Sequence, residues 1–232
     1  MRRAVLLARR EIIEQYSDRG AVIRALVFVG LPIALVVVNR GNGRTGDLTI
    51  LIFALQAALL PAATAINAAA GSFAAEKEAQ TLVPLLATPV RDIDIVAGKL
   101  LAVLAPAAAL SAVSIIAFDI AASAVHGADR VARVLSPATL YGLFALSVFL
   151  ILTIGAWVMV VSARVGSQRT AQQIAGFVLA GTIVTLSALG AAILSLAPEI
   201  VIGVLVAVVI SDLVALELAR RLWDREEAVA RL

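Results

Sequence analysis

Cysteine is absent from this 232-residue chain, and histidine occurs once, as His126. Without cysteine the protein has no disulfide, no thiolate metal ligand and no cysteine nucleophile. A single histidine cannot supply a metal site made of several histidines, so we expect His126 to be an ordinary residue of an external loop. Charge is scarce as well: 15% of the residues are charged, where a soluble globular domain has about 25%.

Apolar residues are in large excess. They make up 62% of the chain, compared with about 45–50% in an average soluble domain. A domain of this length could not bury so much apolar surface, because its surface area grows nearly as fast as its volume. The excess must therefore face lipid, and the sequence predicts an integral membrane protein.

Six apolar stretches are long enough to cross a bilayer, which takes about 20 residues. They lie near 22–38, 48–70, 97–120, 139–163, 171–194 and 199–219. Only Ala197-Pro198-Glu199 separates the last two, so a re-entrant hairpin near 187–198 is the alternative there. The prediction is a single all-α, polytopic membrane domain covering 1–232, with six transmembrane helices.

An amphipathic segment, residues 4–16, precedes the first predicted span. Its apolar side carries Val5, Ala8, Ile12, Ile13 and Tyr16, and its polar side carries Arg10, Glu11 and Glu14. A helix of this kind lies in the plane of the membrane with its basic residues toward the headgroups. We therefore expect an interfacial (elbow) helix, and the alternative is a solvated N-terminal helix.

The distribution of lysine and arginine indicates the orientation. If the N-terminus is cytoplasmic, fifteen of the nineteen basic residues fall in inner segments, and the four in outer segments are Arg40, Arg44, Arg130 and Arg133. Inner connections are the ones rich in Lys and Arg. Both termini are therefore expected in the cytoplasm.

Small residues are dense in two places, from Ala62 to Ala75 and from Gly176 to Gly181. Small side chains let membrane helices approach one another closely, so both stretches are candidate helix-contact faces. A general bias of this chain toward alanine is the alternative explanation.

The longest inner connection, about 71–96, is the most informative part of the chain. Charges at Glu76, Lys77 and Glu78 mark the exit from the bilayer, and Asp92 suits the first turn of the third span because a helix N-terminus favours negative charge.

A short helix is expected inside this connection. Thr81 can cap it, with Pro84 in its first turn, where a missing N–H costs little. It carries three leucines, Leu82, Leu85 and Leu86, and ends before Thr88-Pro89. Exposed apolar residues of this kind indicate a partner surface, and the alternative is that the helix packs against the protein's own inner ends.

The residues of this connection resemble a known family signature. The pattern is Glu76-x-Glu78-x-x-Thr81-Leu82-x-x-Leu85-Leu86-x-Thr88-Pro89, followed nine residues later by Gly98-Lys99. It is similar to ABC-2-type transporter permeases, which include bacterial drug, polysaccharide, lipid and sodium exporters. A second stretch, from Ser162 to Gln173, resembles the same family. Gln80 and Val83 depart from it, since the family often has Gly and Glu there.

The resemblance implies a transport subunit of an ATP-driven exporter in the bacterial cytoplasmic (inner) membrane. The inner connection would be the coupling loop that contacts a separate ATP-binding subunit, through Glu76, Glu78, Thr81, Leu82, Leu85, Leu86, Thr88 and Pro89. ATP and Mg²⁺ would be bound by that subunit. Six spans offer half a pathway, and two-fold assemblies are the commonest oligomers, so we expect a second permease chain in a homodimer. Membrane lipids are further partners, and no nucleic acid is expected.

The chain has no phosphate-binding loop of its own. Its single Gly-Lys pair, Gly98-Lys99, has Ile93 where G-x-x-x-x-G-K-[ST] needs glycine, and Leu100 where the motif needs a hydroxyl. Backbone N–H groups and that hydroxyl hold the phosphates and Mg²⁺. The chain is therefore not expected to be an enzyme or to bind a cofactor, and ATP hydrolysis belongs to another polypeptide.

Polar residues within spans are costly and point to function or to helix pairing. Asp212 either lines a pathway or pairs with a neighbouring Arg or hydroxyl, and Asp119 either does the same or reaches external water. Gln56, Asn67 and Ser111 are candidate links between helices. An ion-coupled secondary transporter acting without an ATPase is the alternative function. An intramembrane enzyme is disfavoured, since the one histidine lies outside the spans.

Overall fold

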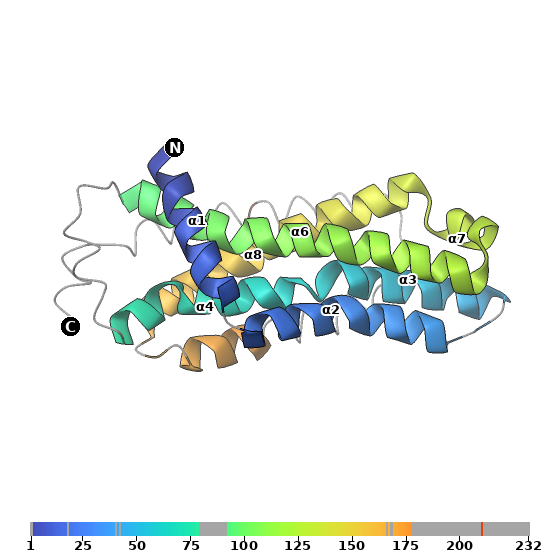
Figure 1. Cartoon of the computed structure of the whole chain (residues 1–232), viewed down its shortest axis with the longest axis horizontal. Helices are drawn as coiled ribbons and strands as arrows, with labels where there is room; N and C mark the ends of the chain where they lie inside the picture. The colour runs from blue at the N-terminus through green and yellow to red at the C-terminus, as the bar shows by residue number, and fades with distance from the viewer. Residues whose placement is uncertain are drawn as a thin grey trace.

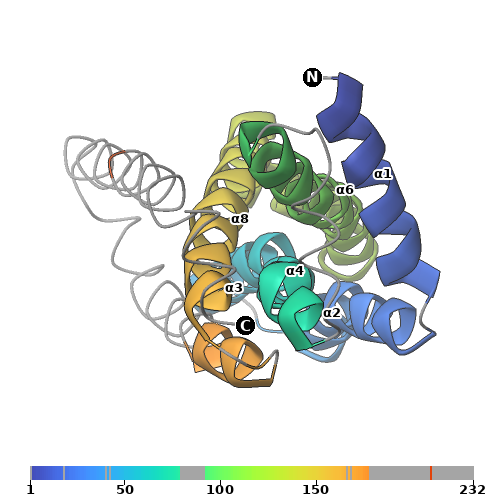
Figure 2. The same ribbon diagram turned by 90° about the vertical axis from the view of Figure 1, so that its left-hand side faces the viewer.

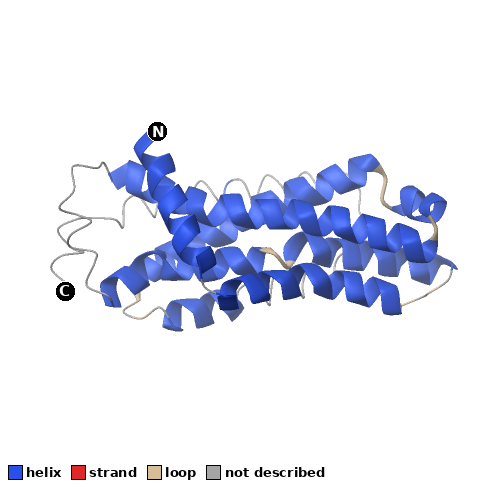
Figure 3. Cartoon of the chain, viewed as in Figure 1, coloured by secondary structure: helices blue, strands red, loops and turns tan. Residues whose placement is uncertain are grey.

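The computed structural model describes residues 2–17, 19–39, 41, 43–78, 92–165, 167, 169–177 and 210. This part of the chain consists of helices and short turns, without strands (Figure 3). In order, the helices are α1 (Arg2–Ser17), α2 (Arg19–Val38), α3 (Gly43–Leu59), α4 (Ala62–Glu78), α6 (Asp92–His126), α7 (Ala128–Val134) and α8 (Pro137–Arg164). Residues 169–177 are also helical.

The long helices form an elongated bundle. In Figure 1, α2, α3, α4, α6 and α8 run along its length, α1 lies across one end and α7 lies at the other. Figure 2, which looks at the end crossed by α1, shows α4 between α2 and α8, with α1 on the outer side of α6. The arrangement is that of a membrane bundle whose two ends have different structures.

Four segments have the length and apolar composition of membrane spans: Arg19–Val38, Thr45–Ser72, Ala97–His126 and Pro137–Ser162. They confirm the first four predicted spans. Of the predicted span 171–194 the structure describes 171–177, which is helical, and of 199–219 only residue 210. The total of six spans and a re-entrant hairpin near 187–198 stay predictions outside the described residues.

The second span is broken in the middle, where the sequence predicts one continuous helix. α3 ends at Leu59 and α4 begins at Ala62, with a turn between them. Pro61 has no N–H to continue the ladder of α3. Its carbonyl accepts the Thr64 N–H at 3.0 Å and the Thr64 hydroxyl at 2.7 Å. On its α4 side, the turn is therefore closed by the two hydrogen bonds between Thr64 and the Pro61 carbonyl.

The inner connection is shorter than the predicted 71–96. α4 continues to Glu78 and α6 starts at Asp92, so helix covers both ends of that range. α6 has 35 residues, which corresponds to about 52 Å and exceeds the hydrocarbon core of about 30 Å. Hydropathy marks where a helix enters lipid, and these helices continue beyond that point.

The far end of the bundle is shaped by caps and one glycine. Gly127 separates α6 from α7 with a φ of 89°, and a positive φ favours glycine because it has no Cβ. His126 is the last residue of α6 rather than a loop residue, and its Nε2 lies 3.3 Å from the Val36 carbonyl oxygen. Ser136 caps α8 by accepting the Thr139 N–H at 3.2 Å, with Pro137 at the first helical position.

Two apolar clusters form the core and meet near the break in the second span. The first includes five alanines of α4, which pack against α6 and α8: Ala62, Ala65, Ala69, Ala70 and Ala74. This confirms the Ala62–Ala75 stretch as a contact face. The second cluster joins α3 to the other halves of α6 and α8. Of the other predicted contact face, Gly176 to Gly181, Gly176 is exposed, and a Cβ there would meet nothing within 4 Å. Residues 178–181 of that stretch lie outside the described residues.

Candidate functional site

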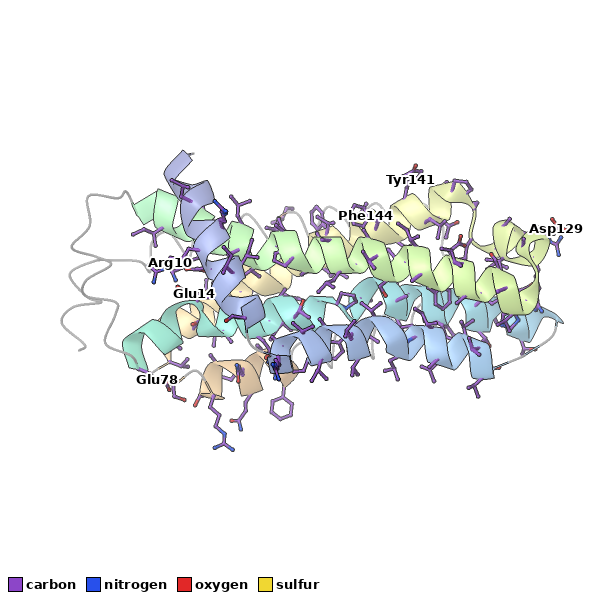
Figure 4. The ribbon with its side chains drawn as sticks, viewed as in Figure 1. Arg10, Glu14, Glu78, Asp129, Tyr141 and Phe144 are labelled. Atoms are coloured by element: carbon purple, nitrogen blue, oxygen red, sulfur yellow. The ribbon has the colours of Figure 1, made fainter. Side chains whose placement is uncertain are left out.

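The residues that carry the family resemblance point to the end of the bundle where α4 stops and α6 starts. Glu76 and Glu78 lie in the last turn of α4, and Figure 4 shows Glu78 at the end that α1 crosses, opposite Asp129 on α7. Six further residues of the predicted contact lie outside the described residues: Thr81, Leu82, Leu85, Leu86, Thr88 and Pro89.

Lys99 is buried beside this end of the bundle, with 2% of its surface exposed. Its Nζ donates to Oε1 of Glu11 on α1 at 2.9 Å and to the carbonyl oxygen of Ser72 on α4 at 2.7 Å. One ammonium group on α6 therefore joins three helices. A buried charge of this kind is stable only with partners, because removing it from water is costly.

Ser162 makes a second buried connection, from α8 to α4. Its hydroxyl accepts the Ala74 N–H at 3.0 Å and donates to the Ala70 carbonyl oxygen at 2.8 Å. These two backbone groups are four residues apart, the spacing that pairs them in an uninterrupted α-helix. The hydroxyl bridges them and so fixes α8 to the backbone of α4.

Both connections fall on the same stretch of α4, residues 70–74, within two turns of its end. We name this set the α4 clamp: Glu11, Ser72, Lys99 and Ser162, with the backbone of Ala70 and Ala74. Lys99 and Ser162 come from the two separate motifs on which the resemblance rests. The fold therefore brings both motifs to the helix that leads into the inner connection.

A comparison with protein families agrees with this arrangement. The model of a family described as "ABC-2 family transporter protein" matches residues 7–218. The chain belongs to the ABC-2 transporter family. It is therefore a multi-pass membrane permease of an ABC transporter, a transport component. No curated protein matches the sequence at a significant level.

The N-terminal helix of this ABC-2 permease contacts the bundle through residues of both predicted sides. From the polar side, Glu11 faces Lys99, and from the apolar side, Ala8 is buried at 6% exposure. Ile13, also of the predicted apolar side, is 61% exposed, and Leu6 is 60% exposed. Apolar periodicity did not indicate that Glu11 faces the bundle, where it pairs with the buried ammonium of Lys99.

The polar residues predicted within the spans of the permease do not form one site. Asn67 donates from Nδ2 to the carbonyl oxygen of Ala63 in its own helix at 3.2 Å, which is not a link between helices. Gln56 and Asp119 are half-buried, and Asp212 lies outside the described residues. Within the described chain, no hydrogen bond joins Gln56, Asn67 or Asp119 to another of the three, and no cluster of His, Asp and Glu could hold a metal.

Ser111 is a link between helices, as predicted, and it lies at the break in the second span. Its hydroxyl donates to the Ala58 carbonyl oxygen at 2.9 Å and lies 2.7 Å from the hydroxyl of Ser147 on α8. Ser147 in turn donates to the Phe144 carbonyl oxygen at 2.7 Å. Neither Ser147 nor the break was predicted from the sequence. Pro61 in mid-span was the available signal, because proline lacks the N–H that would pair with the Ala57 carbonyl and so interrupts the helix.

Proposed function

We propose that this permease is the membrane subunit of an ATP-driven exporter and that it works with a separate ATP-binding subunit. The observation that carries the proposal is the α4 clamp, which fixes the helix leading into the family's signature segment to three other helices. A segment that receives force from a partner must be firmly attached to the spans that move. The contact to the ATP-binding subunit would be made by Glu76, Glu78, Thr81, Leu82, Leu85, Leu86, Thr88 and Pro89.

The proposed orientation places the end with α1 in the cytoplasm of a bacterial cell, at its inner membrane. Basic residues concentrate on the cytoplasmic side of membrane proteins, so the outer end is the one with few of them. The arginines assigned to the outer side do lie at the end opposite α1 (Figure 1): Arg130 and Arg133 on α7, and Arg44 in the first turn of α3. The four outer arginines are outnumbered by the fifteen inner basic residues. Both termini would then be cytoplasmic.

We further propose that α1 lies at the lipid interface. Leu6 and Ile13 point away from the bundle, and Arg9 and Arg10 are exposed beside them. Such a face suits the boundary between acyl chains and anionic headgroups. Lipid would thus cover the side of α1 that the bundle leaves open.

A homodimer of permeases is part of the proposal. The first span has only 17% of its apolar window buried, against 61% in the second, so its surface is available to lipid and to a second copy. Two copies would enclose a pathway that one lacks. Gln56, Asn67, Asp119 and Asp212 are the intramembrane polar residues to test as pathway residues.

The direct test replaces two leucines of the signature segment with acid. We expect Leu82→Glu with Leu85→Glu to abolish co-purification of the ATP-binding subunit, because two charges would oppose an apolar contact. The matched control is Ala132→Glu, which adds charge at an exposed position of α7 at the other end of the bundle. Retained binding and full transport by the double variant would remove the proposed contact.

The cargo class is resolved by reconstitution. Purified permease and ATP-binding subunit in vesicles are screened with ions, lipids, drugs and glycans, and the cargo is expected to stimulate ATP hydrolysis. Cargo accumulation on the side opposite ATP gives the direction of transport. Short connections at the α7 end leave no large external domain there, so cargo entering from the bilayer or the cytoplasm fits the described chain best.

A second candidate function is supported by the break at Leu60–Pro61. Ion-coupled secondary transporters use interrupted helices whose unwound carbonyls coordinate ions near the bilayer midplane. Here the Ala58 carbonyl at the break accepts the Ser111 hydroxyl, which lies 2.7 Å from the hydroxyl of Ser147. Such a transporter would use the downhill movement of an ion to drive the cargo across the membrane, with no ATPase present. Transport by the permease alone, abolished by an ionophore, would favour this function over the first.

A further inference from the structure

The N-terminal helix is attached to the bundle mainly through its contact with α6. α1 lies across α6 at the end where α4 stops (Figure 2). Ala8 is buried in this contact and Ile12 is half-buried, whereas Leu6 and Ile13 are 60% and 61% exposed. The described apolar side chains of this 16-residue helix are thus divided between a side that packs against α6 and a side that faces away from the bundle.

The Lys99–Glu11 pair is the buried polar element of this contact. The Lys99 side chain is 3% exposed and that of Glu11 is 28% exposed, with 2.9 Å between Nζ and Oε1. Separating them would take a carboxylate away from a buried ammonium, which is unfavourable. α1 and α6 are therefore expected to move together at this point.

Helix α1 also carries an ion pair that is exposed to solvent. Arg10 and Glu14 lie one turn apart on α1, 2.8 Å from each other, with side chains 74% and 60% exposed. Exposed pairs contribute little, because water and salt screen them. Glu11 and Glu14 thus provide a half-buried and an exposed carboxylate on one helix.

The Lys99 ammonium also binds the helix that leads into the signature segment. Ser72, whose carbonyl oxygen accepts from Nζ at 2.7 Å, lies six residues before the end of α4, and Lys99 lies seven residues after the start of α6. Both positions are about two turns from the helix ends that flank that segment, the end of α4 and the start of α6. Lys99 therefore links α1 to both of these helix ends, in addition to the packing of α1 against α6.

We propose that Lys99 is a positioning residue that transmits binding of the ATP-binding subunit from the ends of α4 and α6 to α1. This inference rests on the proposed function, and it assigns α1 the role of a responding element rather than a contact surface. Ser162 performs the equivalent task toward α8, through its bridge to Ala70 and Ala74. Binding of the partner would thereby affect the positions of α1, α6 and α8 together.

Hydrogen exchange on the full complex tests the proposal, because exchange reports local opening of each helix. We expect the ATP-bound partner to slow exchange several-fold both in peptides spanning 76–92 and in peptides of α1. In Lys99→Met and in Glu11→Gln, slowing in α1 is expected to be lost while slowing over 76–92 persists. Glu14→Gln, which breaks only the exposed pair, should behave as the unmodified chain.

Each result decides between defined alternatives. If peptides spanning 76–92 show no slowing in the unmodified chain, the proposed contact with the ATP-binding subunit fails. If they slow but α1 does not, or if α1 slows equally in Lys99→Met, then Lys99 does not transmit binding and the inference is overturned. Persisting protection over 76–92 in each variant shows that the variant is folded and binds its partner. Ser162→Ala should lose protection in the last turns of α8 and retain it in α1.

Discussion

Individual hydroxyl groups stabilise this bundle where its second span is interrupted. Ser111 and Ser114 lie three residues apart on α6 and are both fully buried at 0% exposure. The Ser111 hydroxyl bonds to the Ala58 carbonyl and to Ser147, whereas the Ser114 hydroxyl is the one buried side-chain oxygen without a partner among the described residues. The same chemical group is thus satisfied at one position and not at the other.

Replacing these two serines by alanine should have opposite effects on stability. Ser111→Ala leaves the Ala58 carbonyl unpaired and is expected to cost about 1–3 kcal/mol, toward the low end because interhelical hydrogen bonds in membranes average about 0.6 kcal/mol. Ser114→Ala removes an unsatisfied hydroxyl and should be neutral or stabilising. Unfolding of each purified variant in mixed micelles measures the difference. Equal loss at both positions would contradict this account.

At the scale of elements, the turn between α2 and α3 is held by α7. Arg130 donates from Nε to Asp47 Oδ1 at 2.7 Å, and its other nitrogens donate to the carbonyl oxygens of Gly41 at 3.2 Å and Gly43 at 2.8 Å. A Cβ on Gly46 would overlap the Gly41 carbonyl and the Arg130 guanidinium. Glycine is therefore required here by close approach, and the turn, α3 and α7 form one packed unit.

Gly46→Ala is expected to destabilise the protein by about 1–3 kcal/mol, the usual cost of overpacking. Gly30→Ala on α2 is the matched control, because a Cβ there meets nothing within 4 Å and alanine favours a helix over glycine by about 0.5–1 kcal/mol. Thermal unfolding in detergent compares the two. A Gly46→Ala protein as stable as Gly30→Ala would show that the turn can relax without cost.

The elements also show what the sequence could and could not predict. Apolar length predicted the first four spans, because lipid exposure leaves a composition signal in every residue of a span. The Pro61 break was readable in principle, since proline removes a specific donor. The pairing of Glu11 with Lys99 spans 88 positions, and nothing in helical periodicity selects that partner, so the sequence did not predict which residues of α1 face the bundle. The contact residues at 81–89 and Asp212 stay predictions outside the described chain.

The whole molecule has two ends held by different chemistry. One end carries the α4 clamp, in which a buried ammonium and a buried hydroxyl fix α1, α6 and α8 to α4. The other carries Arg130, whose side chain is 20% exposed and bonds mostly to backbone oxygens. If the first end receives the ATP-binding subunit, it must be cytoplasmic, and the second must face outward.

Thiol labelling tests that orientation directly, because the chain has no cysteine of its own. Asp129→Cys on α7 and Glu14→Cys on α1 place single thiols at exposed positions of opposite ends (Figure 4). A membrane-impermeant maleimide added to intact cells should label Asp129→Cys at once and Glu14→Cys only after permeabilisation. Reaction of Glu14→Cys in intact cells would place α1 outside, beyond the reach of any cytoplasmic ATPase, and the proposed exporter mechanism would fail with it.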